Sequence, residues 1–302
     1  MIKLQGIVVP LVTPFLQDGC LDKESLARLT GHIIAGGVNG IFPCSTAGEF
    51  AHLSLDEKID VVKTVTEVNN GRVPIYAGVT AESIEETIAT LKEIEQFKPA
   101  GMVIAPLVYH SNRELLRHME HVVNITSTAI ILYNNDRLIK PPLKKANIRT
   151  KILKSISRLD RVIGLKDSSG DIHRFYNYLQ AVKQRKDFAV LQGSEPEIFD
   201  GLKAGAKGAV DGLSNLFPEL CVKLYKSFFD RPEQCAKIQQ EITELGEIVY
   251  IRRTKIIGGI KRALFIKKII KTCKTRDEKQ NLSSEEAVQV ARVIEKDENT
   301  WN

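Results

Sequence analysis

Eight short apolar segments recur along the chain, and each is followed by a longer stretch with helical spacing. The segments are rich in Val, Ile and Leu and occupy residues 6–13, 40–44, 73–79, 101–107, 129–133, 162–166, 188–192 and 208–213. They are continuous rather than alternating, which is typical of parallel strands that are covered on both faces. We therefore predict eight parallel β-strands.

Helices are expected between these strands. Ser54 and Ser83 each stand three residues before a Glu, the pattern of a capping box that begins a helix. After Ser83, the side chains of Ile84, Ile88 and Leu91 share one helical face. The other expected helices cover 22–36, 113–125, 144–157, 171–185, 195–204 and 217–230. Eight strand–helix pairs in this length predict an α/β fold, a closed (β/α)₈ barrel over residues 1–230.

Residues 231–302 contain no strand-like segment and predict additional helices that pack against the barrel. The last helix is expected to begin at Ser283 and Ser284, and its apolar face carries Ala287, Val290, Val293 and Ile294. The segment is also basic. Its cations, interspersed with Ile and Leu, predict an amphipathic helix with a solvated charged face: Arg252, Arg253, Lys255, Lys261, Arg262, Lys267, Lys268, Lys271 and Lys274.

The chain of 302 residues carries a net charge of +6, which raises the question of a nucleic-acid or membrane partner. No basic stripe with interleaved aromatic residues accompanies that charge, so a Lys-rich solvated surface or a small anionic substrate explains it better. The first residues lack the features of a signal peptide, and no apolar run approaches the roughly 20 residues of a spanning helix. We expect a soluble, cytoplasmic protein that binds neither nucleic acid nor membrane.

The cysteine and histidine patterns predict neither disulfides nor a metal. Cys20, Cys44, Cys221, Cys235 and Cys273 include no CxxC pair, and their number is odd. The six histidines are scattered without a recognisable ligand spacing. The two common nucleotide-cradling loops, GxGxxG after the first strand and GxxxxGK[ST], are absent from the sequence. No metal and no cofactor are expected.

Catalytic groups of a barrel of this kind lie at the carboxyl ends of its strands, and three predicted strand ends carry reactive side chains. Lys166 ends the sixth run after four apolar or small residues, where burial favours the neutral amine that a nucleophile needs. Tyr133 ends the fifth run and is a plausible proton carrier, although tyrosine is also a common packing residue. The second run leads into residues 44–49, whose small hydroxyl residues and glycine leave backbone N–H groups able to bind a carboxylate. Cys44 itself is expected to be a buried small side chain.

These segments, in this order, resemble the dihydrodipicolinate synthase and N-acetylneuraminate lyase family of Schiff-base barrels. Residues 6–15 are similar to the family's opening strand, and Ser45-Thr46-Ala47-Gly48-Glu49 resembles its G-[ST]-T-G-E loop. Leu132-Tyr133-Asn134 resembles its Y-N motif, Gly164-Leu165-Lys166-Asp167 its lysine motif, and residues 205–209 its entry to the last strand. The resemblance covers nearly the whole chain.

The resemblance implies a class I aldolase and a role for each matching residue. Lys166 would attack the 2-keto carbon of pyruvate, Tyr133 would carry protons, and Thr46 would join that relay. The backbone N–H groups of Thr46 and Ala47, in the loop that begins at Ser45, would hold the pyruvate carboxylate. Gly193 and Val210 would line the wall beside the lysine. The resemblance also implies a homotetramer built as a dimer of dimers.

Two departures bear on the aldehyde partner. Synthases that act on aspartate semialdehyde usually carry an Arg five positions after the Tyr, whereas here Arg137 stands at four and Leu138 at five. The family's partner-subunit Tyr usually lies two residues after a Pro, whereas Tyr109 stands three after Pro106. Arg137 and Tyr109 are therefore candidate substrate-binding residues at shifted positions. The departures, with Ala47 in place of a second Thr, favour an aldolase of a 2-keto-3-deoxy sugar acid over dihydrodipicolinate synthase.

Two other interpretations remain open. A barrel that binds a ligand without catalysis is compatible with the loss of one hydroxyl at Ala47. A phosphate-binding barrel enzyme is suggested by the glycines of residues 192–195 and 211–215, although Glu195 and Asp211 would repel a phosphate.

Overall fold

The computed structural model describes residues 3–107, 109, 111–138 and 148–298. Its eight strands are all parallel and form one sheet in the order β2-β1-β8-β7-β6-β5-β4-β3. They are β1 (Gly6–Pro10), β2 (Gly40–Phe42), β3 (Tyr76–Gly78), β4 (Gly101–Ile104), β5 (Ile130–Asn134), β6 (Val162–Asp167), β7 (Ala189–Gln192) and β8 (Gly208–Ala209). A parallel bridge between Ile41 and Ile75 joins the two ends of this order and closes the ring. The predicted (β/α)₈ barrel is confirmed.

Most strands are shorter than the apolar runs that predicted them. In the first run, the ladder ends at Pro10, yet Leu11, Val12 and Thr13 remain almost fully buried. A run of apolar residues indicates that a segment is buried, whereas a β-strand also requires backbone hydrogen bonds to a neighbouring strand. The extra buried residues form the beginnings of loops at the carboxyl end of the barrel.

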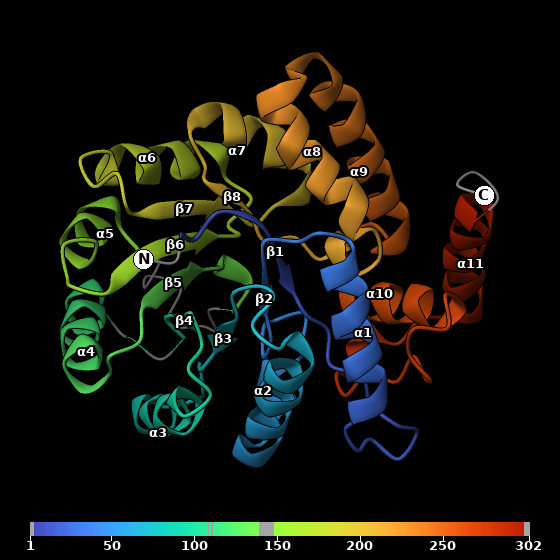
Figure 1. The fold of residues 1–302 in the computed structure, drawn as a ribbon, viewed down its shortest axis with the longest axis horizontal. Helices are drawn as coiled ribbons and strands as arrows, with labels where there is room; N and C mark the ends of the chain where they lie inside the picture. Colours follow the sequence, from blue (N-terminus) through green and yellow to red (C-terminus); the bar gives the residue numbers. More distant parts are fainter. Residues whose placement is uncertain (1–2, 108, 110, 139–147, 299–302) are drawn as a thin grey trace.

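Eight helices alternate with the strands and surround them in Figure 1. They are α1 (Lys23–Ala35), α2 (Leu55–Asn69), α3 (Ile84–Glu95), α4 (Asn112–Ile125), α5 (Thr150–Ile156), α6 (Ile172–Val182), α7 (Ile198–Ala204) and α8 (Pro218–Asp230). Ser54 forms the complete capping box with Glu57, and the hydroxyl of Ser83 accepts from the backbone N–H of Glu86. The helix predicted over 144–157 begins at Thr150, and residues 144–147 lie outside the described part of the chain.

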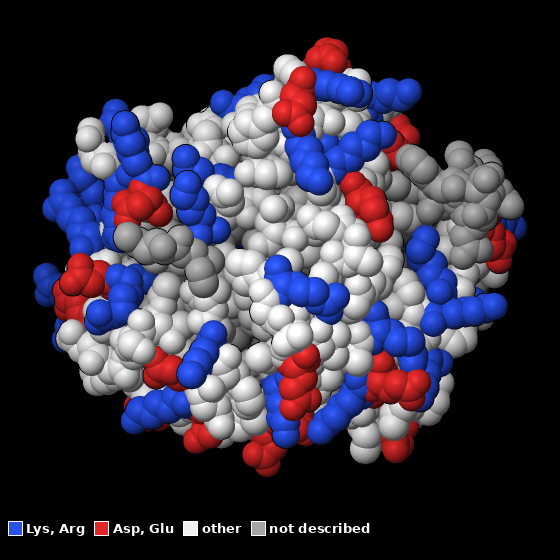
Figure 2. All heavy atoms as spheres, in the orientation of Figure 1, with Lys and Arg blue, Asp and Glu red and all other residues white. Residues whose placement is uncertain are grey.

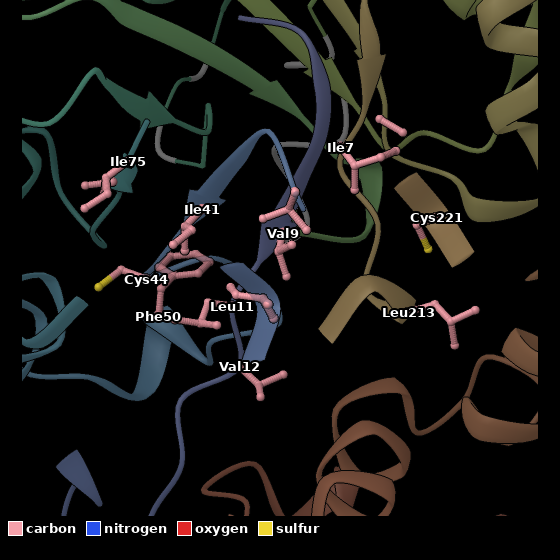
Figure 3. Packing of buried hydrophobic residues seen from close by; sticks show 14 of the residues in the cluster. Ile7, Val9, Leu11, Val12, Ile41, Cys44, Phe50, Ile75, Leu213 and Cys221 are labelled. Atoms are coloured by element: carbon pink, nitrogen blue, oxygen red, sulfur yellow. The ribbon is translucent and has the colours of Figure 1, made fainter. Parts of the chain in front are cut away.

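Side chains alternate along each strand between two buried layers. Ile7 and Val9 of β1 face the helices and belong to the large outer core, part of which Figure 3 shows. Val8, between them, faces the inside of the barrel, where it packs in a smaller cluster that also contains Ile131 and Tyr133. Because the period of a strand is two, the same alternation directs Tyr133 into the barrel.

Three helices follow the barrel: α9 (Cys235–Val249), α10 (Ile256–Ile266) and α11 (Ser284–Glu298). The described residues after 230 include no strand, as predicted. Val290 and Ile294 of α11 are fully buried, whereas Val288 is exposed. In Figure 1, α9 lies beside α8, and α11 stands at the edge of the molecule.

The basic segment does not form the predicted amphipathic helix with a solvated face. α10 ends at Ile266, and Lys268 adopts a left-handed backbone conformation that no helix continues through. Lys261 is fully buried because its ammonium pairs with Glu49. The periodicity detected the apolar face of α10 but not an ion pair formed with a residue more than 200 positions away.

Charged side chains of both signs lie interspersed over the face of the molecule shown in Figure 2, around a largely uncharged centre. Among the described residues, none of the helices is both long and apolar enough to cross a membrane.

Candidate active site

A cavity of about 350 Å³ lies where the carboxyl ends of the strands meet. The ends of β1, β2, β5, β6, β7 and β8 contribute to its lining, as does the segment after α9. Lys166, Tyr133 and Thr46, which the sequence predicted to act together, all line this cavity. Carboxyl ends of barrel strands are where the catalytic groups of such folds lie.

Strand register brings Lys166 and Tyr133 together. They are direct partners in the parallel pairing of β5 with β6. The Nζ atom of Lys166 lies 4.2 Å from the centre of the Tyr133 ring and 5.3 Å from that of Phe42. Lys166 is 5% exposed, so its side chain lies almost wholly inside the protein. A buried amine beside a phenol is a suitable arrangement for a nucleophile with an adjacent proton carrier.

The hydroxyl of Tyr133 is the centre of a hydrogen-bond network. Thr46 Oγ1 lies 3.3 Å from Tyr133 Oη, and Asn135 Nδ2 lies 2.7 Å from it. Burial acts to raise the pKa of Tyr133, but the charge of Lys166 and hydrogen bonds from Thr46, Asn135 and Ser168 outweigh it and lower that pKa. A phenol in this setting is suited to accept and return a proton.

The turn after β2 offers two backbone donors to the cavity. Gly48 N–H donates to Ser45 Oγ, and Glu49 N–H donates to the carbonyl of Thr46, which fixes the turn. Among the described residues, the N–H groups of Thr46 and Ala47 donate to no other group of the chain. Both residues line the cavity, so these donors are available to an anionic group. Ser45 is 1% exposed and holds the turn from within.

A carboxylate from the turn is anchored by the C-terminal segment. Glu49 Oε1 pairs with Lys261 Nζ at 2.5 Å, and Glu49 Oε2 accepts from the backbone N–H groups of Arg276 and Asp277. Burial lowers the pKa of Lys261 to about 8, although Glu49 opposes that shift. The turn that carries Thr46 is thus tied to α10 and to the loop that follows it.

Gly193 and Val210 line the cavity as predicted. A Cβ atom at Gly193 would lie 2.0 Å from Ser168 Oγ and 2.7 Å from the carbonyl oxygen of Asp167, so only glycine fits. Asp167 itself points away from the cavity and accepts hydrogen bonds from Asn134 and Ser169. Burial raises the pKa of Asp167 to about 6.

Several lining residues were not predicted as site residues. Asn135, Ser168 and Ser194 lie beside motif residues, but no pattern distinguished them from ordinary loop residues. Arg253, Thr254 and Gln280 also line the cavity, and they come from the C-terminal segment. Non-glycine residues 251–253 all have positive φ angles, and this turn brings Arg253 to the cavity, where it also pairs with Glu247 at 3.0 Å. Sequence alone gave no sign of such a conformation.

Glu195 and Asp211 follow the ends of β7 and β8. They are the two acidic residues that were expected to repel a phosphate. Glu195 lines the cavity, and its Oε1 accepts from Gly212 N–H and from the hydroxyl of Tyr250. Asp211 is 1% exposed, and burial, followed by the charge of Glu195, raises its pKa to about 7. A carboxylate held at this wall disfavours a bound phosphate.

Tyr109 and Cys44 lie in the packed interior. Tyr109 is 1% exposed, and its ring packs against His118 of α4 at 5.2 Å, so it does not line the described cavity. Burial raises the pKa of Cys44 to about 12, which agrees with the expected inert thiol. The side chain of Arg137 lies outside what the structure describes.

A family model for the dihydrodipicolinate synthetase family matches residues 3–297. The chain belongs to this family. Its members are lyases of the class I aldolase type, which form a Schiff base with pyruvate. The resemblance seen in the sequence is thereby confirmed.

Relatives within this family carry more than one name. The chain is 30% identical over 231 residues to a 4-hydroxy-tetrahydrodipicolinate synthase of Ehrlichia canis, covering 76% of each chain. It is also 30% identical to an uncharacterized DapA-like lyase of Halobacterium salinarum, covering 86% of this chain and 84% of the relative. The dihydrodipicolinate synthase structure from Bacteroides thetaiotaomicron matches with a TM-score of 0.89 and 29% identity, over 98% of this chain and 99% of that one.

The family pattern places the departures at defined points of the cavity. Leu138, five positions after Tyr133, lines the cavity where the synthases usually carry an Arg. Ala47 lines it without the hydroxyl of a second Thr. Both departures therefore lie in the same cavity as Lys166 and Tyr133.

Proposed function

We propose that this protein is a Schiff-base-forming aldolase that joins pyruvate to, or releases it from, the aldehyde derived from a 2-keto-3-deoxy sugar acid. The observation that carries the proposal is the convergence of Lys166, Tyr133 and Thr46 on one cavity. Two unused backbone N–H groups, those of Thr46 and Ala47, supply the matching site for the carboxylate of a 2-keto acid.

In the proposed reaction, the neutral amine of Lys166 adds to the 2-keto carbon and gives a carbinolamine. Tyr133 donates a proton to the departing oxygen, which leaves as water, and an iminium ion remains. Loss of a proton from the pyruvate methyl group gives the enamine, whose carbon bonds to the aldehyde carbon in the condensation direction. In the cleavage direction, the hydroxyl at the fourth carbon gives up its proton as the bond between the third and fourth carbons breaks.

The aldehyde side of the cavity supports a polyhydroxylated partner. Ser194, Glu195, Thr254 and Gln280 all line it and provide hydroxyl, carboxylate and amide groups to hydroxyl-bearing carbons. Leu138 offers no charge to the carboxylate of aspartate semialdehyde. Dihydrodipicolinate synthase activity is the alternative, supported by the names of the relatives.

Borohydride reduction in the presence of pyruvate tests the mechanism. A reduced pyruvyl adduct, located by intact mass and peptide mapping, is expected on Lys166 and is expected to disappear in Lys166→Met. Lys58, which is also buried but lies outside the cavity, serves as an internal control and should stay unmodified. Absence of an adduct in folded wild-type protein would leave a non-catalytic binding barrel as the better account.

A comparison of aldehydes tests the substrate class. With pyruvate present, sugar-derived aldehydes should give higher kcat/KM than aspartate semialdehyde. The reverse order would assign the chain to the synthases. The homotetramer and the cytoplasmic location stay predictions, and light scattering of the purified protein tests the first.

A further inference from the structure

Asn135 is a buried polar residue beside the proposed proton carrier. It follows β5, is 8% exposed and lines the cavity. Side chains two apart along an extended chain project to the same side, so Asn135 shares the side of Tyr133. Asn134, between them, points the other way and donates to Asp167 Oδ1 at 2.8 Å.

The contact between Asn135 and Tyr133 has a defined direction. The amide nitrogen Nδ2 of Asn135 lies 2.7 Å from Tyr133 Oη. An amide NH₂ group donates hydrogen bonds and cannot accept them. The phenol oxygen is therefore the acceptor, and its own proton must point elsewhere. Thr46 Oγ1 lies 3.3 Å from the same oxygen, Ser168 also hydrogen-bonds Tyr133, and Lys166 Nζ lies 4.2 Å from the centre of the Tyr133 ring.

We propose that Asn135 is a positioning residue of the proton relay, whose amide N–H stabilises the phenolate of Tyr133 and directs the phenol proton toward the reacting nitrogen and oxygen. The inference rests on the proposed aldolase function. It gives Asn135 a role that no motif of the sequence indicated.

The chemistry of the amide suits this position better than its alternatives. A neutral amide does not titrate, so it never competes with the substrate for the proton of Tyr133. A carboxylate of the same shape would accept that proton and hold Tyr133 as a phenol. An apolar side chain would leave a lone pair of the buried oxygen without a donor. Burial acts to raise the pKa of Tyr133, but Lys166, Thr46 and then Asn135 lower it. This lowering agrees with donation by the amide of Asn135.

The first test measures Tyr133 directly, without pyruvate. Tyrosine carrying an isotope label at Cζ is incorporated, the Tyr133 resonance is assigned by its loss in Tyr133→Phe, and its titration is followed by NMR. In Asn135→Ala, the midpoint should rise by about one pH unit, because a hydrogen bond to a charged group is lost. Asn135→Asp, which keeps the shape, should raise it at least as far. Midpoints that stay the same or fall in both variants would overturn the proposal.

The second test separates a catalytic effect from a structural one. The rate of borohydride-trapped adduct formation with pyruvate is measured against pH in wild type and in both variants. Because Tyr133 acts as a proton donor in the proposed step, the alkaline limb should move up by the same shift as the Tyr133 titration. A drop of equal size at every pH would show that Asn135 only maintains the fold, which would overturn the proposal.

The two tests distinguish the failure of each proposal. If wild type forms no adduct but the Tyr133 midpoint shifts as expected, the aldolase function is wrong and the hydrogen bond stands. If wild type forms the adduct and the midpoint does not move, the role of Asn135 is wrong and the aldolase function stands.

Discussion

Replacing Lys261 by Met isolates the buried ion pair that ties the C-terminal segment to the active-site turn. The side chains of Lys261 and Glu49 are 0% and 1% exposed, so the substitution leaves a carboxylate buried without its cation. Removing one partner of such a pair costs about 3–5 kcal/mol. Two backbone N–H groups still donate to Glu49, so the lower end of that range is expected. Urea unfolding at neutral pH, followed by circular dichroism, measures the loss.

Two further variants test whether the unpaired buried carboxylate causes the loss of stability. Lys271→Met removes an exposed pair with Glu24, which water and salt screen, and should change the free energy of unfolding far less than Lys261→Met. Adding Glu49→Gln to Lys261→Met removes the unpaired charge and should recover part of the stability. A loss in Lys261→Met no larger than in Lys271→Met, or a double variant no more stable than the single, would refute the account. Since Glu49 ends the turn that offers N–H groups to pyruvate, KM for pyruvate should also rise.

Three more outcomes are expected. Tyr133→Phe should still form the pyruvate adduct, but about 10²- to 10⁴-fold more slowly, as measured by the rate of borohydride trapping. Asp211→Asn should stabilise the protein at pH 8 but hardly at pH 4. Burial raises the pKa of Asp211 to about 7 in the folded protein. The wild-type protein therefore loses up to about 4 kcal/mol of stability as pH rises from the unfolded pKa of Asp211 to about 7. A gain in the melting temperature of Asp211→Asn that does not grow with pH would contradict this. Gly193→Ala should abolish adduct formation because the new methyl group would lie 2.7 Å from a backbone carbonyl oxygen, whereas Gly31→Ala, with nothing within 4 Å, should leave it unchanged.

The reactive side chains were predictable because they stand at the ends of strands. A run of apolar residues ending in Lys166 indicates a strand, and the barrel geometry then places its end in a shared cavity. The partnership of Lys166 with Tyr133 needs only that two neighbouring parallel strands have the same register. The side of a strand to which a residue points follows from its local sequence. The closure of the sheet into a barrel follows from the number of strands.

The remainder of the cavity was not predictable from local pattern. Arg253 and Gln280 line the cavity but belong to a segment whose sequence predicts only solvated helix and loop. Tertiary packing brings them there. Lys261 was expected on a charged outer face because its partner is distant in the sequence. Tyr109 was a candidate at the place of a residue that a partner subunit would contribute, and that role stays a prediction; within one chain its ring packs against His118.

The C-terminal segment therefore belongs to the active site rather than only to its support. It fixes the turn of Thr46 through Lys261, and it fixes Glu195 through the hydroxyl of Tyr250 at 2.9 Å. These two contacts hold two parts of the cavity lining: the turn, whose N–H groups would bind the proposed 2-keto acid, and Glu195, which would face the proposed aldehyde. In the proposed function, Lys166 and Tyr133 stand at strand ends that the barrel fixes, whereas Thr254 and Gln280, which would contact the aldehyde, come from the C-terminal segment. Substitutions of Thr254 and Gln280 should accordingly change which aldehyde is accepted more readily than whether the Schiff base forms.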